Sequence, residues 1–327
     1  MSDQKAKRRV TAADIARSLG ISRATVGFVL NDTPGQTISP ATRQRVLDEA
    51  TRLGYRPHLG ARALASGQSR IILLVLPDWP IDYAMREHID EASSALDQAG
   101  YSLVTMTPHS SGRARPLWET LQPDLVMGLV PFSAEQAAVI AGSGSRVVSP
   151  DLVAPEIGAD LEYALGPQVQ VEHLAARGHR RIAFATTTDP RLASLATDRE
   201  ALARSTAARL GVELSVEAVD ESNAADHVAA WTAAGVTAGA GYTADIASLV
   251  LGAALRAGVE VPGRLAVIGH DDTPLARRLV PSLSSIHVDA AGLGRYFAEL
   301  ALHSVEGRAA PVATPTTKAT LVVRESS

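Results

Sequence analysis

A glycine turn between two short helical patterns, in residues 10–31, constrains the fold of this chain more than any other feature. The segment reads VTAADIARSLGISRATVGFVLN. Thr11 precedes apolar residues at helical spacing, and Asp14 stands where a capping box places its acidic residue. Gly20 ends the first pattern because glycine readily takes the positive φ of a tight turn. Ser22 then caps the second helical pattern.

A third helical pattern follows these two. It begins with Ser39 and Pro40, an N-cap followed by proline at the first helical position, and it ends at Gly54. Its expected apolar stripe consists of Val46, Leu47, Ala50 and Leu53. Three short helices with a glycine turn between the first two predict an all-α helix-turn-helix head.

Charge is divided unevenly along the chain. Residues 1–70 contain 12 Lys and Arg against 5 Asp and Glu, whereas the remainder contains 19 basic and 30 acidic residues. A basic head on an acidic body predicts a nucleic-acid surface at one end. The second helix of such a head enters the DNA major groove, where Arg23 could pair with guanine. The residues expected to hold phosphates are Ser22, Thr25, and Arg43 or Arg45. A three-helix protein-interaction module is the alternative.

The composition argues against several other classes of protein. Cysteine is absent, which excludes disulfides, a thiol nucleophile and a cysteine metal site and fits a reducing cytoplasm. The polar N-terminus does not resemble a secretory signal, and no run of about 18 apolar residues predicts a membrane span. Phosphate-loop, G-x-S-x-G and H-E-x-x-H motifs are missing, and AGSGS at 141–145 is expected to be a loop. We therefore expect a cytoplasmic protein that uses no cofactor or metal and is not an enzyme.

Beyond residue 70 the pattern changes to short apolar strands that alternate with helices, which predicts an α/β body with parallel sheets. Helices are expected over 83–99, around 168–177 and over about 192–210. The expected strands read IILLVLP after Arg70, then YSLVTM, DLVMGLV, RVVSP, RRIAFAT, TAGAGY and LAVIGHD.

The head resembles the lactose-repressor (LacI/GalR) family of bacterial regulators. The matching residues run from Thr11 through Asp14-Ile15-Ala16 and Gly20-Ile21-Ser22 to Val29-Leu30-Asn31, and continue in Leu53-Gly54-Tyr55-Arg56-Pro57. In the body, HLAARGHRRIAFAT at 173–186, the stretch 258–286 and the C-terminal LVVRESS also match. The resemblance covers nearly the whole chain and implies a homodimeric regulator that binds operator DNA.

The resemblance also implies how the head reads DNA. Its outward recognition positions map onto Arg23, Ala24, Gly27 and Phe28, and Phe28 could touch a thymine methyl or belong partly to the core. Residues 59–69 correspond to a hinge helix, although Gly60 also suits a plain linker. Within the hinge, Arg62 contacts phosphate, and Leu64, followed by Ala65, wedges into the minor groove. The full set of expected DNA-binding residues is Thr11, Ser22, Arg23, Ala24, Thr25, Gly27, Phe28, Asn31, Arg43, Tyr55, Arg62, Leu64 and Ala65.

The implied architecture has a helix-turn-helix domain over 1–58, the hinge over 59–69, and an effector-binding and dimerisation domain over 70–327. The last is a two-lobed fold like that of periplasmic sugar-binding proteins. Its N-lobe spans about 70–164 and 288–317, and its C-lobe about 165–287 and 318–327. A small molecule is expected between the lobes, at the carboxyl ends of the strands.

Six positions carry the expected effector contacts: Asp78, Trp79, Arg199, Thr243, His270 and Asp271. Arg199 and Asp271 align with residues that hold the effector in many relatives, although Arg199 could be an ordinary surface arginine. Asp271 could be a turn or cap aspartate, and Asp272 is better read as a cap. Trp79 could stack on a ring or simply pack.

The sequence departs from the family where most members carry Asn-Asp. Here Thr243 and Ala244 replace that pair, which removes an amide and a carboxylate from the expected pocket. The resemblance therefore implies a repressor whose effector is a sugar, nucleoside or other metabolite, with an ordinary hexose disfavoured. The alternative is a regulator of the same fold that responds to a protein partner or has no small-molecule effector.

Overall fold

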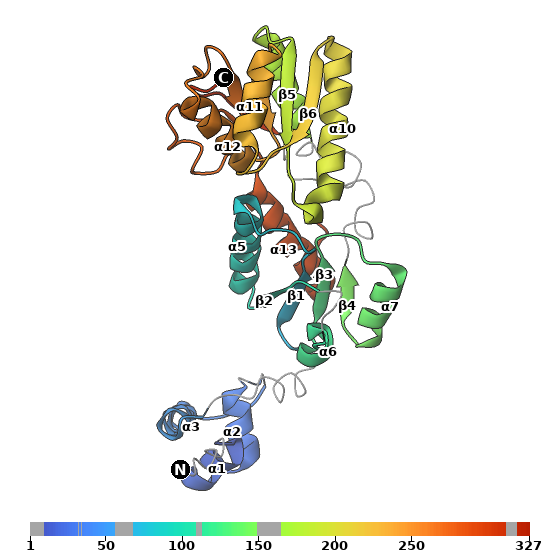
Figure 1. The fold of residues 1–327 in the computed structure, drawn as a ribbon. Helices are drawn as coiled ribbons and strands as arrows, with labels where there is room; N and C mark the ends of the chain where they lie inside the picture. Colours follow the sequence, from blue (N-terminus) through green and yellow to red (C-terminus); the bar gives the residue numbers. More distant parts are fainter. Residues whose placement is uncertain are drawn as a thin grey trace, which may run out of the picture. The chain divides into compact units, whose positions relative to one another are not determined.

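The computed structural model divides the chain into two compact units, the head, Met1–Arg70, and the body, Ile71–Ser327 (Figure 1). It describes residues 10–31, 33, 35–55, 68–108, 113–148, 165–311 and 319–327. Each unit has its own hydrophobic core.

The head contains the three helices expected from the sequence, α1 (Ala12–Leu19), α2 (Arg23–Leu30) and α3 (Pro40–Leu53). The backbone N–H and hydroxyl of Thr11 both donate to Asp14. Gly20 ends α1 with a φ of 65°. Ser22 accepts a hydrogen bond from the Thr25 backbone N–H, as an N-cap should.

The core of the head is built from the inner faces of all three helices. Its fully or nearly fully buried residues are Ile15, Ala16, Val26, Val29, Val46 and Ala50. Leu47, expected in the apolar stripe of α3, is instead 41% exposed. The stripe prediction was wrong there because Leu47 follows Val46 by a rotation of about 100°, which turns it past the edge of the buried face.

A polar cluster closes one side of the head core. Glu49 on α3 is only 9% exposed and accepts hydrogen bonds from Arg52 Nε and Nη2, each 2.6 Å long. The hydroxyl of Ser18 on α1 also donates to Glu49. The hydrogen bonds from Arg52, followed by that from Ser18, lower the pKa of Glu49 to about 2. The carboxylate therefore links α1 to α3 in its ionised form.

This cluster predicts an acid-dependent loss of head stability. The pKa of Glu49 is lower in the folded head than its ordinary value of 4.5. The stabilisation is therefore complete above pH 4.5 and is lost as the pH falls toward 2. Glu49→Gln should flatten the pH dependence of head unfolding between pH 5 and 2, followed by NMR signals of α1 and α3. Asp48→Asn, at the neighbouring exposed carboxylate, is the control. An unchanged profile in Glu49→Gln would contradict the prediction.

The N-lobe of the body contains a parallel sheet in the order β2-β1-β3-β4. Its strands are β1 (Ile71–Val75), β2 (Ser102–Met106), β3 (Leu125–Gly128) and β4 (Arg146–Val148). Alternate β1 residues face opposite sides, as strand geometry requires. Ile72 and Leu74 pack under α5 (Tyr83–Gln98) and α13 (Ala290–Glu306), and Leu73 and Val75 pack under α6 (Leu117–Leu121) and α7 (Ala134–Gly142).

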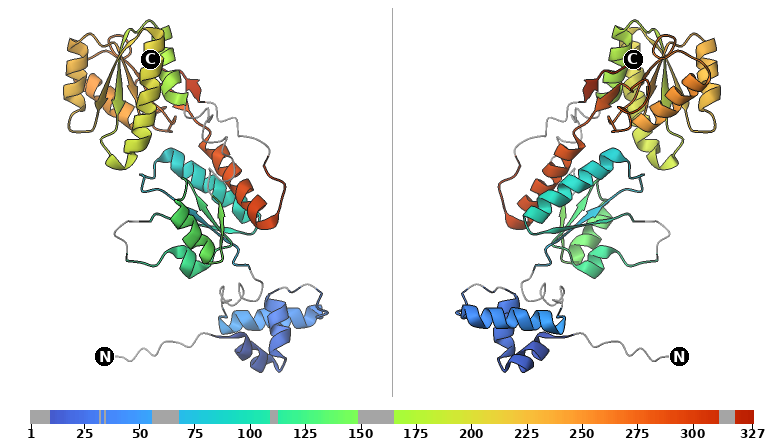
Figure 2. Two further views of the ribbon diagram at one scale, coloured as in Figure 1. Left: turned by 90° about the vertical axis from the view of Figure 1, so that its right-hand side faces the viewer. Right: turned by 90° about the vertical axis from the view of Figure 1, so that its left-hand side faces the viewer.

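The C-lobe repeats this layered arrangement with the order β6-β5-β7-β8, again parallel (Figure 2). Its strands are β5 (Arg181–Thr186), β6 (Glu213–Ala218), β7 (Ala238–Gly241) and β8 (Ala266–Ile268). One face is covered by α9 (Gly166–Ala176) and α10 (Ala193–Leu210), which follows the short 3₁₀ turn η2 (Pro190–Leu192). The other is covered by α11 (Ala224–Ala233) and α12 (Ala244–Arg256). No strand was expected from the sequence at the position of β6.

The end of the chain passes through both lobes. After β9 (Ser285–His287), helix α13 lies against α5 in the N-lobe, and β10 (Thr320–Val322) then pairs antiparallel with β9. Ser326 reaches the C-lobe core, where its backbone carbonyl accepts from Val267 N–H. The fold is therefore the expected two-lobed α/β body with parallel sheets.

Candidate DNA-reading helix and ligand cavity

The outer face of α2 carries the expected recognition residues. Arg23 and Ala24 are exposed, and Gly27 and Phe28 are partly exposed. Phe28 is not among the described residues packed on the head core, and its side chain is partly exposed. A partly exposed phenylalanine and an exposed arginine therefore offer an apolar contact and a bidentate donor on the outer surface of α2.

The other expected DNA contacts have mixed surroundings. Thr11, Ser22 and Asn31 are exposed at helix ends. Tyr55, by contrast, packs against the head core, which leaves only part of its side chain for DNA. The hinge residues Arg62, Leu64 and Ala65 lie outside the described residues, so the wedge stays a prediction.

A cavity of about 480 Å³ lies in the body, lined from both lobes. Of the six expected effector positions, five line it: Trp79, Arg199, Thr243, His270 and Asp271. Asp78 does not line it and is exposed. Arg199 comes from α10. Thr243 follows the end of β7, and His270 and Asp271 follow the end of β8. The cavity therefore opens at the carboxyl edge of the C-lobe sheet, where parallel sheets bind ligands.

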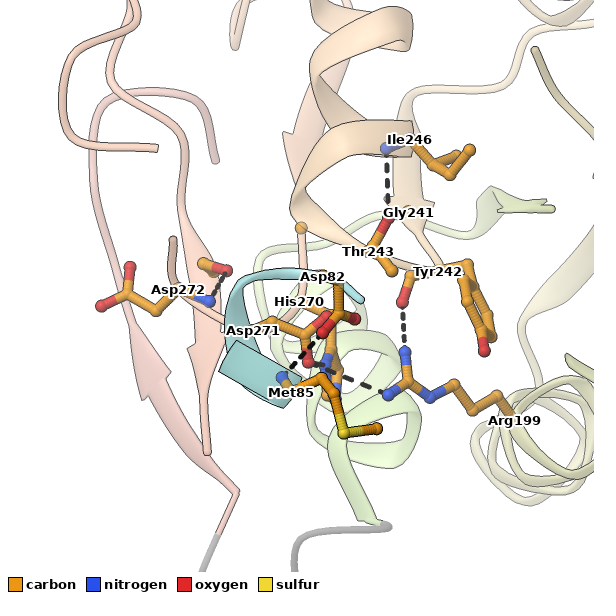
Figure 3. A network of polar contacts seen from close by, with 12 residues as sticks. Asp82, Met85, Arg199, Gly241, Tyr242, Thr243, Ile246, His270, Asp271 and Asp272 are labelled. Carbon is orange, nitrogen blue, oxygen red and sulfur yellow. Dashed lines mark hydrogen bonds and ion pairs between the residues drawn. The ribbon is translucent and has the colours of Figure 1, made fainter. Parts of the chain in front are cut away.

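Arg199 lines this cavity and is held by several contacts (Figure 3). Its Nη1 donates to the Tyr242 carbonyl at 2.5 Å, and its Nη2 lies 3.8 Å from Asp271 Oδ1. The guanidinium carbon also sits 4.4 Å from the centre of the Tyr242 ring, a cation–π geometry. The arginine is 26% exposed, so its remaining N–H groups can reach a ligand.

Asp271 is held by His270, whose Nδ1 lies 2.6 Å from Asp271 Oδ1. Burial lowers the pKa of His270, so we assign a neutral ring whose Nδ1–H donates to the carboxylate. Although burial alone raises the pKa of Asp271, the His270 ring and the Arg199 guanidinium together bring it below its ordinary value. Asp271 is therefore an ionised acceptor with a φ of 75°, a strained backbone of the kind that gathers at ligand sites.

The His270 ring is locked from behind by close packing. A Cβ on Gly166, the first residue of α9, would lie only 1.9 Å from His270 Nε2. His270 is 1% exposed, and among the described residues its Nε2 has no hydrogen-bond partner. Glycine at 166 is thus required for the ring to lie where it orients Asp271.

Gln170 on α9 joins the two loops that carry these residues. Its side-chain amide donates to the carbonyls of Gly241 and Gly269, each at 2.9 Å. Those carbonyls directly precede Tyr242 and His270. Gln170 is fully buried and is not among the residues that line the cavity, so it is a positioning residue.

Asp272 has a different role from the helix cap expected from the sequence. Its side chain turns away from the Arg199 cluster (Figure 3) and forms an ion pair with Arg324 Nη2 at 2.6 Å. Its backbone N–H donates to Ser285. The cap prediction was wrong because the partner arrives from 52 positions further along the chain, beyond the reach of a local pattern.

Thr243 combines a cap with a place in the cavity wall. Its hydroxyl accepts from the Ile246 backbone N–H at 3.3 Å and so caps α12. The Thr243 replacement noted in the sequence thus keeps the helix start while shortening the polar group that faces the cavity.

Several cavity residues were not anticipated from the sequence. Asp82 caps α5 by accepting from the Met85 N–H at 2.8 Å. The cavity walls reduce its solvation, and nearby Asp271 adds repulsion, so the pKa of Asp82 is raised. The N-cap pattern of Asp82 could have been found in the sequence, but its position opposite Arg199 could not. The other unanticipated lining residues include His88, Tyr242, Leu293 and Phe297.

Both the head and the body are similar to known protein families. The model of the lacI family of bacterial regulatory proteins matches residues 11–58, and the periplasmic binding protein-like domain matches residues 171–327. The transcriptional regulator reg1 of Streptomyces lividans is 30% identical over 96% of both chains. The HTH-type transcriptional regulator GalR of Escherichia coli is 28% identical over 97% of this chain and 95% of its own.

Solved structures share the same fold. The lac repressor dimer bound to operator and the anti-inducer ONPF superposes with a TM-score of 0.76 at 22% identity, covering 98% of this chain and 99% of that one. Across the described ranges, none of the helices has the length and apolar character needed to cross a membrane. Within the same ranges, no group of three metal-ligating side chains occurs.

Proposed function

Because the chain belongs to the lacI family of bacterial regulatory proteins and is a DNA-binding transcriptional regulator, we propose that it acts as a homodimeric repressor controlled by a small molecule. The ligand binds in the cavity of the body, called the effector cavity from here on. Its binding changes the affinity of the paired heads for operator DNA.

The observation that carries this proposal is the arrangement around Arg199. A partly exposed guanidinium and an ionised, pre-oriented Asp271 face a cavity to which both lobes contribute. Large apolar cavities with a few convergent polar groups are typical ligand sites. A ligand that contacts both lobes favours one arrangement of them, and that preference is the origin of coupling, usually about 1–3 kcal/mol.

The DNA side of the proposal rests on α2. Two heads of a symmetric dimer bind two half-sites of a near-palindromic operator, one per major groove. The structure of the lac repressor dimer bound to its operator supports this arrangement. Arg23 and Phe28 read bases, and the caps of α2 and α3 contact phosphates.

The experiment that tests the proposal measures DNA binding by the full chain with and without metabolites. An operator is first selected from random duplexes, and its affinity is measured by fluorescence anisotropy over a range of salt concentrations. Affinity should fall steeply with salt because phosphate contacts release counterions. A metabolite screen should then find a compound that changes the affinity. A screen in which nothing does so would instead favour control by a protein partner.

Arg23→Ala should lower sequence specificity more than overall binding. A bidentate arginine–guanine contact contributes about 1–3 kcal/mol of discrimination, so preference for the selected operator should fall roughly 5- to 150-fold. Arg43→Ala is the comparison, because losing a phosphate contact weakens all sequences alike and lowers the salt slope by about 1. Identical behaviour of the two variants would remove Arg23 from base reading.

Arg199→Ala should weaken ligand binding at least about tenfold, because a charge-assisted hydrogen bond contributes about 1.5–3 kcal/mol. The measurement is calorimetric titration with the metabolite found in the screen. Arg204→Ala, at an exposed position of the same helix, should bind normally. Both variants should still bind DNA when no ligand is present. If Arg199→Ala bound the metabolite with the affinity of the unchanged protein, the ligand would have to bind elsewhere.

A further inference from the structure

The C-lobe sheet has an open edge with a groove beside it. Strand β6 is the edge strand, and within the described ranges it pairs only with β5 (Figure 1). The β6 groove, as it is called from here on, is lined chiefly by Arg181, Glu213, Ser215, Glu217, His227 and Trp231. We propose that this edge and groove bind an extended basic segment of a partner protein, which adds a strand to the sheet. The groove and the effector cavity share no lining residue, so the two can be tested separately.

The backbone of β6 offers hydrogen-bonding groups along its open edge. The Glu213 N–H donates to the Arg180 carbonyl, on the β5 side, at 2.9 Å. Because successive residues of a strand point their backbone groups to opposite sides, the N–H and carbonyl groups of Leu214 and Val216 point away from β5. Across the part of the chain that the structure describes, these groups have no backbone partner. Such an edge is a template for an added strand.

The size and lining of the β6 groove suit the side chain of a lysine or arginine. Its volume is about 240 Å³, below the range of about 300–1,000 Å³ that is typical of small-molecule pockets. The buried side chains of Ile182, Trp231 and Val236 give it an apolar floor, and Glu213 and Glu217 add carboxylates. Lysine and arginine have an apolar stem and a charged head, so the stem can pack on this floor while the head meets a carboxylate.

Charge complementarity favours a basic occupant. From Glu213 to Gly235 the chain contains five acidic residues and no lysine or arginine. Glu217 accepts a hydrogen bond from the Ser215 hydroxyl at 3.1 Å and has no cationic partner among the described residues. Glu213 pairs with Arg181 at 3.1 Å, but both side chains are more than half exposed. Because such surface pairs contribute little, a cation of the partner can compete for Glu213.

A second copy of this chain fits the same edge poorly. Two β6 strands paired antiparallel about Ser215 would place Glu213 of each copy opposite Glu217 of the other, and like charges directly opposite each other destabilise a sheet. A segment with two basic residues four positions apart would form opposite-charge pairs at both places instead. Because alternate side chains of a strand share one face, the residue midway between them faces Ser215 and should be small or polar.

The test uses strand-forming heptapeptides on the full chain. Each has the order Thr-Z-Val-Ser-Val-Z-Thr, where Z is Lys, Arg, Glu or Gln, and binding is measured by fluorescence anisotropy. The Lys or Arg peptide should bind at least about tenfold more tightly than the Glu peptide. N-methylation of the alternate set of peptide amides that faces β6 should weaken binding at least about tenfold, because backbone hydrogen bonds are lost, and N-methylation of the other set should weaken it less.

Variants and hydrogen exchange locate the peptide on β6. Glu217→Gln should weaken binding of the Lys peptide about threefold through loss of a charge pair. Glu260→Gln, at an exposed carboxylate of the same lobe outside the groove, should leave binding unchanged. Val216→Pro should weaken it at least about tenfold, because proline removes an N–H at an edge where it is tolerated. If that variant does not fold in urea titrations, Glu217→Gln and the N-methylated peptides decide. The bound peptide should slow hydrogen exchange in the segment that contains Leu214 and Val216.

Other occupants of the edge would give different results, and each would overturn the inference. Equal binding of Lys and Glu peptides, or no binding of either basic peptide, would exclude recognition of a basic segment. Spermidine that binds as tightly as the Lys peptide would show a site for a free cation without strand addition. Exchange in β6 that slows with rising protein concentration, without peptide, would mean that a second copy covers the edge. None of these measurements involves operator DNA or an effector, so the proposed function stands or falls separately.

Discussion

Arg324→Met should lower the free energy of unfolding of the body by roughly 3 kcal/mol, because it leaves the Asp272 carboxylate buried without its main partner. Asp272 is 5% exposed and Arg324 13% exposed, and their charged atoms lie 2.6 Å apart. Arg324 Nη1 also donates to the Leu283 carbonyl at 2.7 Å. The more distant Arg277, 3.8 Å from the other carboxylate oxygen, limits the loss to the lower end of the range for broken buried pairs.

The measurement is urea-induced unfolding of the full chain at pH 7, with an exposed ion pair as control. Arg308 lies 2.7 Å from Glu306, and the two side chains are 53% and 26% exposed. Arg308→Met should cost no more than about 1 kcal/mol because surface pairs are screened. The double variant Asp272→Asn/Arg324→Met should recover part of the loss. A cost in Arg324→Met equal to that in Arg308→Met would show that the buried pair does not stabilise the body.

The helices of the head could be predicted well because each cap acts within one turn. Ser22 and Thr25 are three positions apart, as are Thr11 and Asp14, so the pattern that marks the helix start is also the pattern that satisfies its N–H groups. The strand runs of the body were predicted for a similar reason. Strands buried on both faces, such as β1 and β5, read as continuous apolar segments.

The parts that escaped prediction depend on distant partners or on weak local signals. β6 lies at the sheet edge and is only partly buried, so its alternation of polar and apolar residues carries no continuous apolar run. Arg324 and Asp272 meet only because the chain returns to the C-lobe after α13. The resemblance to a known family supplied Arg199 and Asp271. It did not supply Asp82 or His88, which reach the cavity through the packing of α5.

Two adjacent aspartates show how one turn serves two purposes. Asp271 faces the effector cavity and is oriented by His270, whereas Asp272 faces the opposite direction and ties the turn to the end of the chain. Both have positive φ values, 75° and 38°. The ion pair of Asp272 helps to hold this strained turn, and the turn presents Asp271 to the cavity.

Gln170→Leu should lower the free energy of unfolding by roughly 2–4 kcal/mol and also weaken ligand binding. Its amide hydrogen bonds go to the carbonyls of Gly241 and Gly269 inside the C-lobe. A leucine of similar size removes the donor and leaves buried carbonyl groups with fewer partners, at about 1–3 kcal/mol each. The lower end of this range of free-energy cost applies to the Gly269 carbonyl, because it also accepts a hydrogen bond from the Ile286 N–H.

The neighbouring Gln168 provides a matched control for this prediction. It lies on the same helix, and its described hydrogen bond goes to Glu172, at 2.9 Å and one turn away. Gln168→Leu should therefore change stability by no more than about 0.5 kcal/mol, measured by the same urea unfolding. Because the Gln170 side chain connects the loops of Tyr242 and His270, removing it should release the groups that position Arg199 and Asp271. Under conditions where both variants are fully folded, ligand affinity should fall in Gln170→Leu and stay normal in Gln168→Leu. Loss of stability with unchanged affinity would mean that Gln170 supports the C-lobe core without positioning the site.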